Sequence, residues 1–104
     1  MPVIENTSNR LVLKSGSTTL TLDRATSTAT LQRKILLWGL KPHEVSLSQI
    51  MEVNTDKAVD RASGAEIWHT LLLMRGGEAW AFPASDEQDA GASATAIRGF
   101  LQQG

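Results

Sequence analysis

The sequence contains no cysteine, which excludes disulfide bonds, thiolate catalysis and metal sites with cysteine ligands. Long hydrophobic runs are missing too: residues 35–38 are apolar, but a helix needs about 20 apolar residues to cross a bilayer. Neither charge dominates, because 10 Lys and Arg face 11 Asp and Glu, for a net charge of −1. The composition therefore gives no overall attraction to nucleic acid or to an anionic membrane.

The length of 104 residues fits a single domain, and a hydrophobic content of 41% is enough for a core. The first ten residues are polar overall and lack the apolar stretch of a secretory signal, so we expect a soluble, cytoplasmic protein. We also expect residues 1–9 to be a flexible segment and residues 10–104 to form the domain.

Much of the chain alternates apolar and polar residues, which is typical of half-buried β-strands. The segments with this pattern are 11–14, 18–23, 28–34 and 45–53, the last with a bend near Gln49. Residues 35–40 are mostly apolar and fit either a buried strand or a helical turn. Before Pro42, Lys41 should be extended. The polar segment 54–64 is expected to be a long exposed connection.

A hairpin is predicted around Gly76-Gly77, because paired glycines suit the two-residue turn between antiparallel strands. With a turn of that length, Leu73 lies opposite Trp80 and Leu71 lies opposite Phe82. Since directly opposite side chains point to the same side of a sheet, these four should share the face that packs into the core.

The other face of this hairpin carries Trp68, Leu72, Met74, Ala79 and Ala81. A strand pair with one face on the core normally has a polar second face. A contiguous apolar patch usually marks an interface, and in a symmetric homodimer one patch serves both copies. These five residues are therefore the candidate interface, although the helix could cover them instead.

A C-terminal helix is predicted after Ser85. Ser85 followed three residues later by Gln88 matches a capping box, which makes Ser85 the expected N-cap. The apolar residues at helical spacing, which should form the buried stripe, are Ala90, Ala94, Ile97 and Leu101.

Several short strands followed by one terminal helix exclude a doubly wound parallel sheet and a helix bundle. This order resembles the pleckstrin-homology-like (PH-like) superfold, and bacterial PH-like domains in particular. The segments that carry the resemblance are 20–23, 46–50, the Gly76-Gly77 hairpin with residues 81–83, and 97–101. The resemblance spans residues 10–102. It implies a mainly β, α+β fold in which two antiparallel sheets form an open barrel and one helix plugs an end.

Members of this family bind phosphoinositides, phosphopeptides or protein partners, and the bacterial ones often form homo-oligomers. The lipid binders carry a basic residue in the first strand and further basic residues in the second. Lys14 matches the first place, but residues 18–22 contain no base. Because a phosphate clamp needs converging cations, we expect no specific phosphoinositide binding and interpret Lys14 and Arg24 as solvated surface charges.

Four basic residues are candidates for contact with an anionic surface: Lys14, Arg33, Lys34 and Lys41. The last three surround the apolar run that contains Trp38. Such a cluster on a nearly neutral protein is more often a solvated face.

Metal, cofactor and catalytic motifs are not found in the sequence. His43 and His69 are far apart, without carboxylates at ligand spacing, so a structural role is expected for them. Asn54, Asp56 and Asp60 lack the glycine and the closing glutamate of a calcium loop. Gly-x-Ser-x-Gly and glycine-rich phosphate loops are missing. We therefore expect no enzyme, no cofactor, no metal site and no nucleic-acid partner.

The remaining hypothesis is a protein-binding or self-assembling module. The alternative is a peripheral domain that binds membranes or anionic lipids. The natural partner is left open by the sequence, because fold does not determine function.

Overall fold

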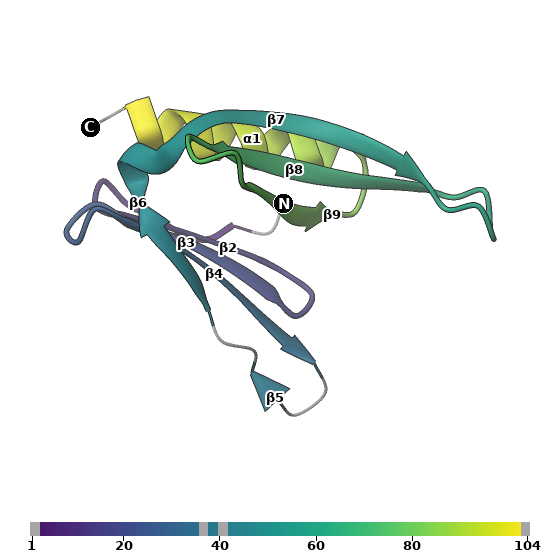
Figure 1. Ribbon diagram of the computed structural model, residues 1–104, viewed down its shortest axis with the longest axis horizontal. Coiled ribbons are helices and arrows are strands. Elements are labelled where there is room, and N and C mark those ends of the chain that lie inside the picture. Colours follow the sequence, from purple (N-terminus) through teal and green to yellow (C-terminus); the bar gives the residue numbers. More distant parts are fainter. Residues whose placement is uncertain (1–2, 36–37, 40–41, 103–104) are drawn as a thin grey trace.

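The computed structural model describes the backbone of residues 3–35, 38–39 and 42–102, and the side chains of residues 5–33 and 42–102. The strands are β1 (Val3–Asn6), β2 (Arg10–Ser15), β3 (Thr18–Asp23), β4 (Thr28–Ile35), β5 (Trp38–Gly39), β6 (His43–Ser46), β7 (Ile50–Val59), β8 (Glu66–Met74) and β9 (Ala79–Ala84). The short 3-10 helix η1 (Leu47–Gln49) precedes β7, and helix α1 (Glu87–Gln102) follows β9. The predicted mainly β fold with a C-terminal helix is confirmed (Figure 1).

The first sheet contains six strands in the order β1-β2-β3-β4-β5, with β6 also paired to β4. Its register brings the predicted apolar positions together: Leu13 lies opposite Leu20, and Leu20 lies opposite Leu31. These leucines are buried, whereas Thr19 and Thr21 on the other side of β3 are only partly buried. Alternation with a period of two therefore specifies both the strands and the buried face of this sheet.

The sequence did not predict one end of the first sheet and left the other end open. The N-terminal segment, predicted to be flexible, contributes β1, whose Glu5 lies opposite Val12. The apolar run 35–40 was predicted to be either a strand or a helical turn. Its described residues form strand, because Trp38 pairs with Ile35. The predicted extended geometry of Lys41 lies outside the described residues.

The bend predicted near Gln49 is present as η1, which carries the chain from β6 into β7 and the second sheet. The prediction that residues 54–64 form one long connection is wrong, because residues 54–59 belong to strand β7. β7 continues to Val59, which lies opposite Glu66, so the connection starts only at Asp60. Asp60 holds this turn by accepting hydrogen bonds from the Ala62 N–H (3.0 Å) and the Ser63 hydroxyl (3.0 Å). The result is a β7–β8 hairpin that projects beyond the rest of the domain (Figure 1).

The second sheet has the order β7-β8-β9, and the β8–β9 register differs from the prediction by one residue. The Met74 N–H donates to the Glu78 carbonyl (2.8 Å), and the Gly77 N–H donates to the Met74 carbonyl (3.0 Å). Gly77 adopts a φ of 93°. These features define the three-residue hairpin loop with a left-handed glycine at its end. Trp80 consequently lies opposite Leu72 rather than opposite Leu73.

A slip of one residue moves side chains to the other face of a strand. Trp80 and Phe82 are buried, as predicted, but the residues opposite them on β8 are Leu72 and Thr70. Leu71 points to the opposite face with Leu73 and is only half-buried. The prediction that Leu71 and Leu73 lie beside Trp80 and Phe82 is therefore wrong.

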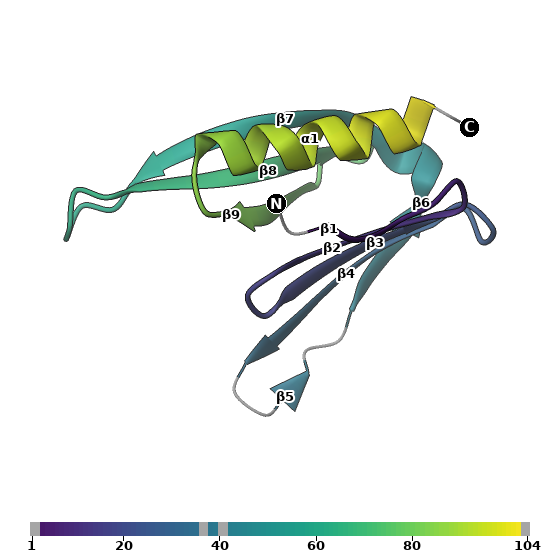
Figure 2. The same ribbon diagram turned by 180° about the vertical axis from the view of Figure 1, so that it is seen from behind.

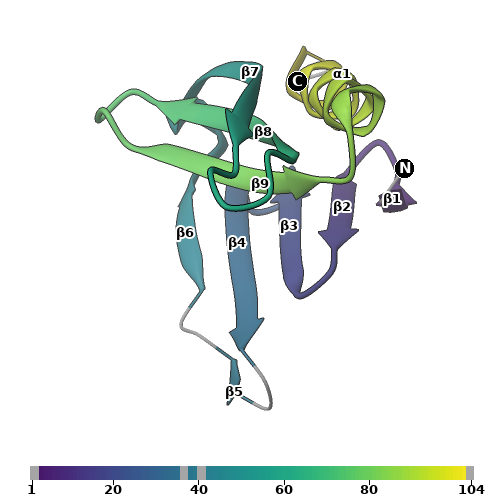
Figure 3. The same ribbon diagram turned by 90° about the vertical axis from the view of Figure 1, so that its right-hand side faces the viewer.

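Helix α1 packs against the inner face of the second sheet and faces the first sheet across the core (Figures 2 and 3). The Thr70 hydroxyl on that inner face donates to the Ala90 carbonyl (3.0 Å). Of the predicted stripe, Ala90, Ala94 and Ile97 are buried, while Leu101 is half-buried. The helix buries Phe100 as well. The two sheets are not closed into a barrel.

The helix N-cap is Asp86, not Ser85. The Asp86 carboxylate accepts a hydrogen bond from the Asp89 N–H (2.8 Å), and its carbonyl accepts from the Ala90 N–H (3.0 Å). Ser85 is one residue outside the helix, and its N–H donates to the Asp89 carboxylate (2.9 Å). Aspartate fills the cap well, because its negative charge lies at the positive end of the helix dipole.

Asp86→Ala is expected to lower the free energy of unfolding by about 1 kcal/mol, because the Asp89 N–H loses its acceptor. A urea titration followed by circular dichroism measures this loss. Ser85→Ala is the matched control and should have a smaller effect, since it removes only an exposed hydroxyl whose hydrogen bond to the Asp89 carboxylate is long (3.3 Å). A larger loss for Ser85→Ala than for Asp86→Ala would return the N-cap to Ser85.

Candidate functional site

The candidate site is the outer face of the second sheet, meaning the face turned away from α1 and the core. It consists of Glu52, Asn54, Asp56 and Ala58 on β7, Ile67, His69, Leu71 and Leu73 on β8, and Ala79, Ala81 and Pro83 on β9. Its centre is apolar except for His69, and Ile67 is 42% exposed. Since α1 lies on the opposite face, the helix does not cover this surface (Figure 2).

The five residues predicted as an interface are not brought together. Leu72 is 0% exposed and Met74 is 3% exposed, so both belong to the core. Trp68 is half-buried on the same side of β8 as Leu72, whereas Ala79 and Ala81 lie on the outer face. The sequence did signal that both faces of this hairpin are apolar. It could not show which residues share a face, because that depends on the loop length, nor which face is free, because that depends on where α1 and the first sheet pack.

The two edges of the second sheet carry groups that hinder the addition of another strand. On β9 the Arg33 guanidinium donates to the Ala81 carbonyl (3.3 Å), and Pro83 has no N–H to offer. On β7 the Arg98 side chain donates to the Val53 carbonyl (3.0 Å from Nε), and Lys57 lies farther along the same strand. Proline and charged side chains are the usual means of blocking an edge strand. Within the described part of the chain, the outer face has no comparable protection.

Charge is distributed unevenly across the outer face. Glu52 and Asp56 are exposed along the β7 side, where they lie opposite Leu73 and His69. The exposed Arg33 is held at the β9 side by its bond to Ala81. One side of this apolar surface is therefore acidic, and the other side has a cation.

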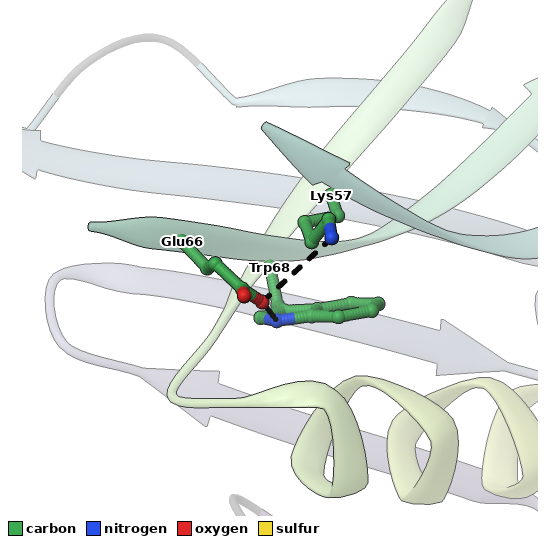
Figure 4. A network of polar contacts seen from close by, with 3 residues as sticks. All are labelled: Lys57, Glu66 and Trp68. Atoms are coloured by element: carbon green, nitrogen blue, oxygen red, sulfur yellow. Dashed lines mark hydrogen bonds and ion pairs between the residues drawn. The ribbon is translucent and has the colours of Figure 1, made fainter. Parts of the chain in front are cut away.

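A polar cluster near the turn end of the projecting hairpin lies on the other side of the sheet (Figure 4). The Trp68 indole N–H donates to the Glu66 carboxylate (3.3 Å), which also pairs with the Lys57 ammonium (3.9 Å). The Lys57 ammonium lies 5.9 Å from the centre of the Trp68 ring. The Lys57 and Glu66 side chains are about half exposed, and exposed ion pairs add little stability. The cluster orients Trp68.

The basic residues predicted to contact an anionic surface do not converge where they are described. Lys14 lines a hollow of about 280 Å³ on the first sheet with Thr19, Thr21 and Gln32. Arg33 extends from the opposite face of that sheet toward β9. The side chains of Lys34 and Lys41 lie outside the described residues. Arg24, interpreted as a solvated surface charge, is instead partly buried against α1.

The histidines are separated as well. His43 is exposed on β6, and His69 is half-buried on the outer face. Among the described residues no group of three or more His, Asp or Glu side chains could hold a metal ion. Within the same residues, no helix has the length and apolar character needed to cross a membrane.

Comparisons with protein-family models, curated proteins and solved structures found no match to this chain. The resemblance to bacterial PH-like domains therefore stays a prediction from the order of strands and helix.

Proposed function

We propose that this chain is a protein-binding module that self-associates through the outer face of its second sheet. The observation that carries the proposal is the apolar centre of that face, formed around Leu71 and Leu73, on the side that α1 does not cover. Burial of apolar surface is the main favourable term in protein association. Because both sheet edges are hindered by Arg33, Pro83 and Arg98, contact by the face is favoured over addition of strands.

The distribution of charge supports a second copy of the same chain as the partner. A two-fold axis parallel to the strands, between two facing sheets, places β7 of each copy over β9 of the other. Glu52 and Asp56 of one copy would then approach Arg33 of the second copy, twice in the dimer. Each protomer presents the same patch, as a closed symmetric dimer requires, and the opposed charges fix its orientation.

Complementary charge reversal tests this arrangement. We expect Glu52→Arg and Arg33→Glu each to weaken the dimer about tenfold or more, because like charges then face each other. A mixture of the two variants should dimerise again, since each reversed charge meets its complement. Sedimentation velocity over a range of concentrations measures the masses. Lys14→Glu, on the outer side of the first sheet, is the matched control and should behave like wild type.

Two results would contradict the proposal in different ways. A wild-type chain that is monomeric at high micromolar concentration would exclude self-association. A wild-type dimer whose single variants are not rescued by mixing would show that the pairing of β7 with β9 is wrong.

A further inference from the structure

A second surface feature is a cavity of about 420 Å³ at the C-terminal end of α1. Four separate segments line it: the β3–β4 turn with Arg24, the region of η1 with Ser48, the β8–β9 turn with Arg75, and the helix with Phe100. It lies apart from the outer face, so it is independent of the proposed dimer.

Arg24 is held rigidly at the wall of this cavity. One of its terminal nitrogens donates to the Phe100 carbonyl at 2.7 Å, and its guanidinium carbon lies 4.5 Å from the centre of the Phe100 ring. The hydrogen bond satisfies one of the carbonyls that a helix leaves unpaired at its C-terminus. This contact uses one donor, and a guanidinium has five.

Arg75 is fixed at the same cavity from another direction. Its Nε donates to the Ser48 carbonyl (2.9 Å), and its backbone N–H donates to the Gln49 carbonyl (2.9 Å). The terminal nitrogens of Arg75 form no hydrogen bond with the described part of the chain. Two arginines that are distant in sequence thus have donors left at one cavity.

Of the residues that the structure describes, no acidic one lines this cavity. In the described ranges the single ion pair joins Lys57 and Glu66, so neither Arg24 nor Arg75 has a carboxylate partner within 4.0 Å. Asp23, the neighbour of Arg24 in sequence, accepts hydrogen bonds from the Ala25 and Thr26 N–H groups instead. Arg24 offsets the partial negative charge at the C-terminal end of α1, and the charge of Arg75 beside it favours an anion at this cavity.

We infer that this cavity binds a small phosphate monoester with an apolar group attached. Guanidinium groups match the oxygens of phosphate in geometry and charge, and the hydroxyls of Ser27 and Ser48 add further donors. The rest of the wall is apolar, with Leu47, Ile50 and Leu101. The cavity is therefore suited to an ester rather than to inorganic phosphate alone.

Isothermal titration calorimetry with phenyl phosphate tests this inference. We expect phenyl phosphate to bind more tightly than inorganic phosphate, and phenol, which lacks the anion, to show no measurable binding. Arg75→Gln should weaken phenyl phosphate about tenfold or more, because it removes charge-assisted hydrogen bonds. Arg61→Gln, an exposed arginine in the β7–β8 connection, is the matched control and should leave binding unchanged.

Arg75→Gln is preferred to a variant of Arg24 because the Arg75 side chain is exposed, so the fold should be kept. Circular dichroism of both variants checks this. No binding of phenyl phosphate at millimolar concentration, or equal binding by both variants, would overturn the site. Binding of phenol as strong as that of phenyl phosphate would show an apolar cavity without anion recognition. Because the charge-reversal test of the dimer leaves Arg24 and Arg75 intact, the two proposals can fail separately.

Discussion

Leu72→Asp is expected to unfold the domain, whereas Leu71→Asp should leave it folded. Leu72 is 0% exposed and lies between Val53 on β7 and Trp80 on β9. Removing a buried leucine typically costs about 2–5 kcal/mol, and an unpaired buried carboxylate adds several more. Domains of this size have a free energy of unfolding of about 5–15 kcal/mol, so the Leu72→Asp variant should retain little or no stability.

Leu71→Asp is the matched control, because it makes the same substitution one residue away, on the other face of the strand. Leu71 is half-buried on the outer face, where an aspartate keeps access to water. Far-UV circular dichroism and the dispersion of amide NMR signals report the fold of both variants. We expect the folded Leu71→Asp variant also to lose self-association, as measured by light scattering. An unfolded Leu71→Asp with a folded Leu72→Asp would reverse the face assignment of β8.

Phe82→Ala should lower the free energy of unfolding by about 3–5 kcal/mol, the usual cost of emptying a buried phenylalanine site. Phe82 is fully buried and lies opposite Thr70 on β8. Its ring contributes to the core between the two sheets and α1, where neighbouring elements cannot all move to fill the gap. Urea denaturation at several protein concentrations measures the loss and separates it from any effect of self-association.

Pro83→Ala is the control for Phe82→Ala, since Pro83 is next in sequence but lies on the outer face of the same edge strand. It should change stability by much less, because no core contact is removed. Equal losses for the two variants would contradict the assignment of Phe82 to the core.

Local pattern was sufficient to predict most elements of this fold. Leu20 and Leu22 alternate with threonines, and Leu11 and Leu13 recur with the same period of two, which is the spacing of residues on one face of a strand. Ala90, Ala94 and Ile97 recur at helical spacing and are buried on α1. The N-cap was misplaced by one residue because Ser85 and Asp86 are both good caps, and the choice depends on how the chain leaves β9.

The errors in the candidate site share one origin. Gly76-Gly77 is compatible with a two-residue or a three-residue loop, and the two loops differ by one residue in register. A polar face would have revealed the correct register, since its burial would be unfavourable. Here Leu71 and Leu72 are equally apolar, so the local sequence does not indicate which of the two is buried.

Composition and periodicity by themselves determined that this chain is mainly β with one C-terminal helix, because hydrophobic spacing acts over a few neighbouring residues. Only the tertiary structure decided which face of the second sheet is free, because that required α1 and the first sheet to occupy the other face. It also decided that Arg24 and Arg75 line one cavity, since residues so far apart in sequence meet only when the turns of both sheets pack against the end of α1.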